Sequence, residues 1–134
     1  MLGIAATEEC LNKYEEFKLA KKIAYLTFII SKSEIKVDKE SAKSDHENEE
    51  AWVKAFINEV KSTGDARFGV VDSNGKICMV SWVPDTAKAQ NKMKYASAKE
   101  PFIQSLQGLS TKLQATDDSE FNYEAVVEST KSKV

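Results

Sequence analysis

Residues 88–102 combine lysines with a methionine on one predicted helix. Lys88, Lys92 and Lys99 fall close to one face of a helix with 3.6 residues per turn, and Met93 borders that face. A flexible apolar side chain with a charged rim is typical of protein interfaces, although single exposed apolar residues also occur on ordinary surfaces. The chemistry that this pattern favours is noncovalent docking to an acidic partner.

The same segment carries residues that must fix it to the rest of the protein. Tyr95 and Phe102 are seven positions apart, so they share the opposite face, which we expect to pack against the core. Pro101 has no N–H and removes the hydrogen bond to the carbonyl of Ser97, so we expect the helix to bend there. A bent helix with lysines and a methionine on one limb is predicted to be a docking element.

The distribution of charge agrees with an acidic partner. The net charge is only −2, but residues 38–50 carry six carboxylates and two lysines, whereas residues 86–113 carry five lysines and one glutamate. Nucleic acid does not fit as the partner, because Arg67 is the only arginine and no basic patch alternates with stacking aromatic residues. An acidic protein surface is the better match.

Residue patterns for catalysis and metal binding are missing. Cys10 and Cys78 lack the spacing of a metal or redox pair, and the only histidine, His46, lies in an acidic loop. We interpret both cysteines as reduced structural thiols. The chain contains none of the common phosphate-binding or nucleophile motifs. We therefore expect no cofactor, no metal and no enzyme activity.

Helices and strands are expected to alternate along the chain. Strands are predicted at 23–31, 33–38 and 112–115 and in a hairpin over 66–83, and helices at 7–22, 49–61, 85–108 and 116–130. Asn74-Gly75 is the pair that best forms a type I′ hairpin turn. This order predicts an α/β fold with a mixed β-sheet of five to six strands sandwiched between helices on both faces. No linker or repeat divides residues 1–134, so we expect a single domain.

The helix ends carry recognisable signals. Thr7 is the predicted N-cap of the first helix, and the pairs Glu8-Glu9 and Asp117-Asp118 are placed at the starts of the first and last helices, where negative charge complements the helix dipole. The predicted apolar side of the first helix consists of Cys10, Leu11, Tyr14, Phe17 and Leu19.

Targeting signals are not recognisable. No apolar run approaches the roughly 20 residues that cross a bilayer. The start MLGIAATEEC lacks the basic and apolar regions of a signal peptide, and its second residue is not the glycine that myristoylation requires. We expect a soluble cytoplasmic protein.

The segment WVPDTAKAQNKMKYASAKEPFIQSLQGL resembles the W-x-P-D-[ST]-A … K-M-x-Y-A-S-x-K … L-x-G block of the actin-depolymerising factor/cofilin family. The stretch GIAATEECLNKYEEFKLAKKIAYLTF is similar to the family's first helix and strand, and LQATDDSEFNYEAVVE is similar to its last strand and helix. The resemblance leaves only residues 38–50 and 73–76 poorly matched. It implies one actin-depolymerising factor homology (ADF-H) domain over residues 1–134.

The resemblance implies a monomeric actin-binding protein of the cytoskeleton. Such a protein binds actin monomers and filaments, prefers ADP-actin and promotes filament disassembly. The positions that match the family's contacts with both forms of actin are Leu2, Gly3, Ile4, Lys92, Met93 and Lys99. The positions that match its additional filament contacts are Lys76, Glu128, Lys131 and Lys133. Acidic phosphoinositides are a further expected ligand of the basic face.

Several positions depart from the family pattern. Basic residues are replaced at Gln90, Ile103-Gln104 and Ser129. The hairpin turn between Val71 and Lys76 is also shorter than in many members, so we expect filament side-binding to be reduced. Leu2 replaces the family's regulatory serine, and inhibition by phosphorylation there is not expected.

Two alternatives remain open. A coactosin-like protein binds the filament side without depolymerising it, but the short hairpin argues against such a function. A small enzyme or ligand-binding domain on a similar sheet would need a deep polar cavity, and the chain offers no cluster of titratable residues to line one.

Overall fold

Six strands and four α-helices alternate along residues 3–131, the part of the chain that the computed structural model describes. The elements are β1 (Ala5–Ala6), α1 (Glu8–Ala20), β2 (Ile23–Ser31), β3 (Glu34–Ala42), the 3-10 helix η1 (Lys43–Asp45), α2 (Glu49–Lys61), β4 (Arg67–Ser73), β5 (Lys76–Trp82), α3 (Ala89–Ser105), β6 (Thr111–Ala115) and α4 (Tyr123–Thr130). This is the predicted order with β1 added. A two-residue strand is too short to produce an alternating sequence pattern.

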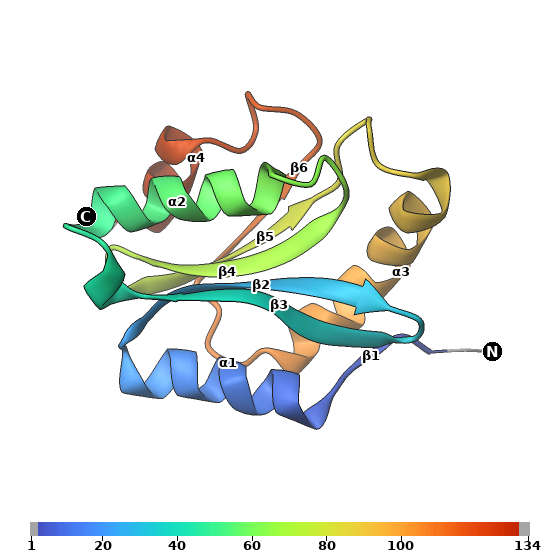
Figure 1. Cartoon of the computed structure of the whole chain (residues 1–134), viewed down its shortest axis with the longest axis horizontal. Helices are drawn as coiled ribbons and strands as arrows, with labels where there is room; N and C mark the ends of the chain where they lie inside the picture. Colours follow the sequence, from blue (N-terminus) through green and yellow to red (C-terminus); the bar gives the residue numbers. More distant parts are fainter. Residues whose placement is uncertain (1–2, 132–134) are drawn as a thin grey trace.

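The strands form one mixed sheet in the order β1-β3-β2-β4-β5-β6 (Figure 1). The edge strands β1 and β6 run parallel to their neighbours, whereas the inner pairs are antiparallel. The predicted hairpin is β4–β5, and its turn residues Asn74 and Gly75 have φ angles of 54° and 74°. Two positive φ angles are what a type I′ turn requires. The predicted mixed sheet of five to six strands is confirmed.

Helices cover both faces of this sheet, as the element order predicts. In Figure 1, α2 and α4 lie on one face, and α1 and α3 lie on the other. The buried side chains form two matching clusters, one with Phe17 and Tyr95 under α1 and α3, the other with Phe56 and Val126 under α2 and α4. The sheet is therefore the middle of three layers.

In the first helix, α1, the predicted N-cap is confirmed, but the predicted apolar side is wrong at one residue. The Thr7 hydroxyl accepts the backbone N–H of Cys10 at 3.1 Å. Cys10, Tyr14 and Phe17 are buried, but Leu19 is 71% exposed. Leu19 lies about 200° around the helix from Phe17, so it falls outside the buried stripe.

The last helix begins later than predicted, at Tyr123. The Asp117-Asp118 pair lies before it in a loop, so the prediction that this pair complements a helix dipole is wrong. The Asp117 carboxylate accepts the backbone N–H of Ser119 at 2.9 Å, and this local turn competes with helix formation. Asp118 instead forms an ion pair of 2.8 Å with Lys61 of α2.

None of the helices within residues 3–131 combines the length and the apolar composition that a membrane-spanning helix needs.

Candidate functional site

The face of α3 that we predict to dock lies on the N-terminal half of the helix. Met93 is 75% exposed, the largest value among the large apolar side chains of residues 3–131. Lys92 and Lys94, on either side of it, are half-buried along their stems. The helix thus presents a flexible apolar side chain with the ammonium group of Lys92 beside it, while Lys94 points about 200° away from Lys92 around the helix.

The opposite face of α3 is buried, as predicted. Tyr95 and Phe102 are 1% and 2% exposed, and both rings pack on Phe68 of β4, with centroid separations of 5.0 and 5.2 Å. The helix continues past Pro101 to Ser105, so the proline does not end it. Packing against the sheet therefore holds together a helix that the proline would otherwise weaken.

The hydroxyl of Tyr95 anchors α3 to the sheet. It accepts the backbone N–H of Ile30 at 3.0 Å, at a point where β2 has passed Phe28, the last residue that it pairs with β4. Burial raises the pKa of Tyr95, so the hydroxyl stays protonated. The side chain thus satisfies a backbone donor of β2 beyond the end of its pairing with β4.

Replacing Tyr95 by phenylalanine should keep the ring packing and remove this acceptor. The unpaired N–H of Ile30 should lower the free energy of unfolding by about 1–3 kcal/mol. Urea titration measures the change, with an unchanged m-value showing that the unfolding transition is otherwise the same. Tyr123→Phe is the matched control, because the Tyr123 hydroxyl makes no hydrogen bond within residues 3–131. Equal stability of Tyr95→Phe and the unsubstituted protein would contradict the anchoring role.

The predicted N-terminal contact segment lies against the C-terminal half of α3. Gly3 is exposed and Ile4 packs partly on the core cluster beneath α3. A shallow hollow between the two segments is lined by Ile4, Pro101 and Phe102. Leu2 lies outside the described residues.

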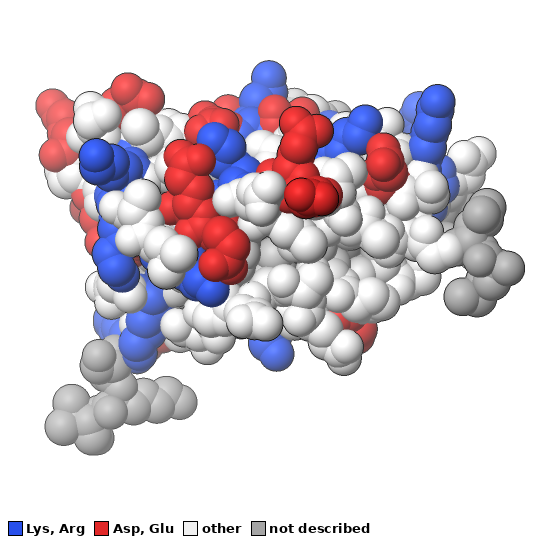
Figure 2. All heavy atoms as spheres, turned by 90° about the horizontal axis from the view of Figure 1, so that it is seen from below, with Lys and Arg blue, Asp and Glu red and all other residues white. Residues whose placement is uncertain are grey.

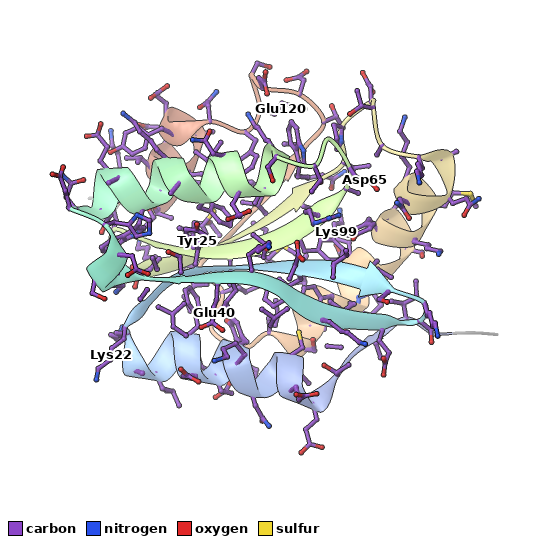
Figure 3. The ribbon with its side chains drawn as sticks, viewed as in Figure 1. Lys22, Tyr25, Glu40, Asp65, Lys99 and Glu120 are labelled. Carbon is purple, nitrogen blue, oxygen red and sulfur yellow. The ribbon has the colours of Figure 1, made fainter. Side chains whose placement is uncertain are left out.

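The predicted lysines of α3 differ in their surroundings. The amino group of Lys99, labelled in Figure 3, donates a hydrogen bond to the side chain of Gln114 on β6. None of the ion pairs within residues 3–131 involves Lys92, and the same is true of Lys88 and Lys94. The charge of Lys92 is therefore not neutralised by a carboxylate of the described residues and is free to meet a partner.

The hairpin tip is tied down to the helices on one face of the sheet. The backbone N–H of Asn74 donates to the Glu49 carboxylate of α2 at 2.8 Å, and its side-chain amide donates to the Thr130 hydroxyl of α4 at 3.0 Å. The Ser73 hydroxyl lies 2.8 Å from the same hydroxyl. The turn is consequently folded against α2 and α4 and does not project.

The charges of the predicted filament side are few. Lys76 is half-buried at the start of β5. Glu128 and Lys131 form an exposed ion pair of 2.8 Å with each other, so they neutralise one another. Lys133 lies outside the described residues.

Sequence reasoning missed the contacts that hold the start of α3. The Thr86 hydroxyl donates to the carbonyl of Gly64 at 2.6 Å, and the Asn91 amide donates to the Asp65 carboxylate at 2.8 Å. One local signal was available: Lys88, the residue at the N-cap position, is a poor capping residue, which indicates that this helix start needs support from elsewhere.

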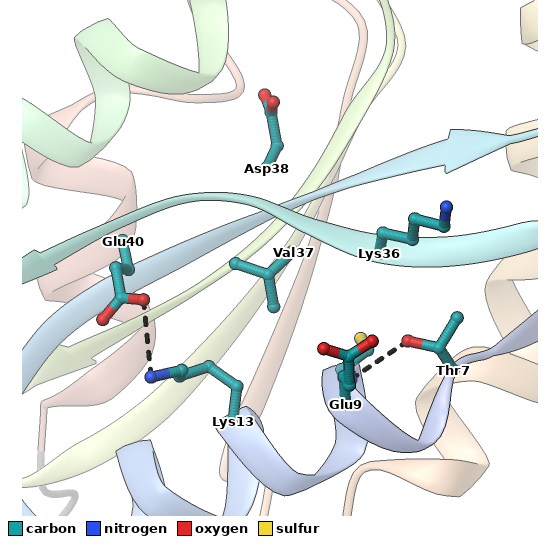
Figure 4. A pocket seen from close by; sticks show the side chains of 8 residues that line it. Thr7, Glu9, Lys13, Lys36, Val37, Asp38 and Glu40 are labelled. Carbon is teal, nitrogen blue, oxygen red and sulfur yellow. Dashed lines mark hydrogen bonds and ion pairs between the residues drawn. The ribbon is translucent and has the colours of Figure 1, made fainter.

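A hollow lies between α1 and β3 (Figure 4), and no residue of α3 lines it. It has a volume of about 430 Å³ and mixed charges at its edge, where Lys13 and Glu40 form an ion pair of 3.4 Å. Burial raises the pKa of the Cys10 thiol in its wall to about 12, so the thiol stays protonated and is no nucleophile. In the part of the chain that the structure describes, no group of three His, Cys, Asp or Glu residues is arranged to hold a metal ion.

The face of the molecule around α1 carries both signs of charge. Seen from below in Figure 2, acidic and basic side chains alternate in the upper part of the view, and much of the lower part is uncharged. Short ion pairs along the helix, Lys13–Glu16 and Lys18–Glu15, contribute to this mixture. This face therefore lacks the single-sign field that would attract a strongly charged partner.

Known proteins resemble this chain along almost its whole length. Residues 3–131 match the family described as cofilin/tropomyosin-type actin-binding protein. The cofilin of Mycosarcoma maydis is 34% identical over 137 residues, covering 94% of this chain and 93% of the relative. The crystal structure of Streptomyces griseoflavus cofilin has a TM-score of 0.81 at 32% identity and covers 96% of this chain and 100% of that one. Actin depolymerization factor 2 of Plasmodium berghei has a TM-score of 0.84 at 22% identity, covering 97% and 99%, a likeness of fold alone.

Proposed function

The chain belongs to the actin-depolymerising factor/cofilin family, and on that premise we propose that it is a monomeric, non-enzymatic protein that binds actin monomers and promotes filament disassembly. The proposal places residues 1–134 in one ADF-H domain that acts in the cytoplasm on the actin cytoskeleton. The observation that carries it is the exposed Met93 with Lys92 beside it, on a helix whose other face is anchored in the core.

The proposed contact surface is the N-terminal half of α3 together with the N-terminal segment. Met93 enters an apolar cleft of actin, where full burial of such a side chain is worth about 1.5–3 kcal/mol. The flexible thioether adapts to the shape of the cleft. Lys92 pairs with acidic groups at the rim, while Leu2, Gly3, Ile4 and Lys99 extend the surface.

We propose that the protein disassembles filaments although it binds the side of the filament only weakly. A second actin subunit would be reached by Lys76, Glu128, Lys131 and Lys133. The hairpin that carries Lys76 is folded against α2 and α4, and Glu128 and Lys131 neutralise one another. Insertion of Met93 of α3 into the actin cleft is then the main contribution to binding. It favours the release of actin subunits over stable decoration of the filament.

Two further properties follow from the family premise. Preference for ADP-actin is expected, since family members favour that form. Acidic phosphoinositides are expected to compete with actin for the lysines of α3, although Ile103 and Gln104 leave this face with fewer charges than is usual. A coactosin-like side binder is the second candidate, and the tied-down hairpin counts against it.

A pelleting assay tests the proposal directly. Actin filaments are centrifuged with increasing amounts of the protein, and both proteins are measured in pellet and supernatant. We expect actin to move into the supernatant with the protein. The proposal fails if all the actin stays in the pellet and all the protein stays in the supernatant, because the protein then binds neither filaments nor monomers. Stoichiometric pelleting without loss of filaments would favour the coactosin-like candidate, and affinities for ADP- and ATP-loaded monomers test the nucleotide preference.

A further inference from the structure

The start of α3 differs from the starts of the other helices. In α1, α2 and α4 a threonine or asparagine side chain caps the first turn, and a glutamate lies within that turn. α3 has Lys88 at the cap position without a side-chain cap in residues 3–131, and its first turn contains no acidic residue. The free N–H groups and the positive end of the helix dipole therefore lack the usual local support. This weakly supported end carries Lys92 and Met93.

The loop between α2 and β4 provides the missing support. The Asp65 carboxylate accepts the side-chain amide of Asn91 through Oδ2 at 2.8 Å, and the carbonyl of Gly64 accepts the Thr86 hydroxyl at 2.6 Å. In Figure 3, Asp65 lies at the end of the sheet beside the first turns of α3. Its carboxylate places a negative charge near the positive end of the helix dipole, where it is stabilising.

Asp65 is itself held in place relative to the sheet. Its second carboxylate oxygen, Oδ1, accepts the backbone N–H of Ala66 at 2.8 Å, and Ala66 is completely buried immediately before β4. The backbone N–H of Asp65 donates to the Thr63 hydroxyl at 3.3 Å. Asp65 takes part in none of the ion pairs within residues 3–131, so no lysine or arginine of that part of the chain neutralises its charge.

We propose that Asp65 is a positioning residue for the docking face, acting through Asn91. Asn91 immediately precedes Lys92, and its side chain points about 100° away from that of Lys92 around the helix. Asp65 therefore holds the first turns of α3 to the sheet while leaving the contact face free. Fixing the helix before binding lowers the entropy that binding must overcome. This inference rests on the proposed function for its effect on actin, but the anchoring itself does not.

A charge-conserving exchange of the two residues tests the proposal. Asn91→Asp sets two carboxylates against each other and should weaken binding to monomeric actin about threefold to tenfold. The double variant Asp65→Asn/Asn91→Asp restores a donor–acceptor pair, because the amide introduced in the loop can donate to the carboxylate introduced on α3 and still accept the N–H of Ala66. Its affinity should return to within about twofold of the unsubstituted protein. The double variant has the original net charge, and it keeps the new carboxylate beside Lys92.

Hydrogen exchange separates positioning from a general effect. In Asn91→Asp, backbone amides of residues 89–95 should exchange faster while those of the central strands do not, and the double variant should reverse this. Failure of the double variant to regain affinity would show that Asn91→Asp acts by repelling actin, and the proposal would be wrong. Faster exchange throughout the protein, or none in α3, would also overturn it. If the unsubstituted protein binds no actin, the proposed function fails, while the exchange data still decide whether Asp65 anchors α3.

Discussion

Lys92→Ala should weaken binding to monomeric actin by at least about tenfold and leave thermal stability unchanged. A charge-assisted contact that becomes desolvated at an interface is worth about 1.5–3 kcal/mol, and 1.4 kcal/mol corresponds to tenfold in affinity. Lys92 takes part in none of the ion pairs within residues 3–131, so its removal breaks no ion pair that supports the fold. The affinity is measured by titrating labelled actin monomers, and stability by thermal melting.

Lys94→Ala is the matched control for this measurement. It removes the same charge from the same helix, but its side chain points about 200° away from that of Lys92. We expect its affinity to stay within about twofold of the unsubstituted protein. Equal losses in the two variants would mean that the lysines act only by long-range attraction. A melting temperature lowered by several degrees in Lys92→Ala would show instead that Lys92 supports the fold.

Binding to filaments should be weak and fall at least about tenfold between roughly 50 and 200 mM salt, whereas binding to monomers should fall much less. In the proposed function, filament binding depends on rim charges such as Lys76, whose attraction is screened over about 8–10 Å at physiological salt. Monomer binding, in the proposed function, also depends on burial of the exposed Met93, and salt does not screen the burial of an apolar side chain. The tied-down hairpin and the Glu128–Lys131 pair leave few other groups to grip a second subunit.

Co-sedimentation and single-filament microscopy across a salt series measure this difference. Lys76→Ala provides an internal check, because it should reduce filament binding further without changing the affinity for monomers. Dense decoration of filaments that persists at high salt would contradict the prediction. Filament binding would then depend on contacts other than the hairpin and α4.

Sequence patterns within short stretches were enough to predict most of the elements and the exposure of Met93 on α3. The pair Asn74-Gly75 has its turn geometry because few other residues adopt positive φ angles readily. Tyr95 and Phe102 are buried and Met93 is exposed because the helical period places them on different faces. Both features depend on residues that are close together in the chain, so the local sequence is enough to predict them.

Local patterns were less reliable where a side chain bonds to the nearby backbone. The Asp117-Asp118 pair is of a type that is common at helix starts, yet Asp117 closes a turn and the helix begins only at Tyr123. Both conformations satisfy the same short sequence, and small differences in free energy decide between them. The parallel pairing of β1 with β3 likewise depends on where the sheet places its edge.

Only the tertiary structure decided how α3 and the hairpin are held. Asn91 and Asp65 are 26 positions apart, Tyr95 and Ile30 are 65 apart, and Asn74 and Thr130 are 56 apart. Each of these hydrogen bonds requires two atoms within about 3 Å, and that distance is set by the order of the strands and the seating of the helices. A sequence specifies which groups can donate and accept, but the packing of the three layers chooses the partners. The anchoring of α3 and the folded-down hairpin are for that reason properties of the assembled sheet.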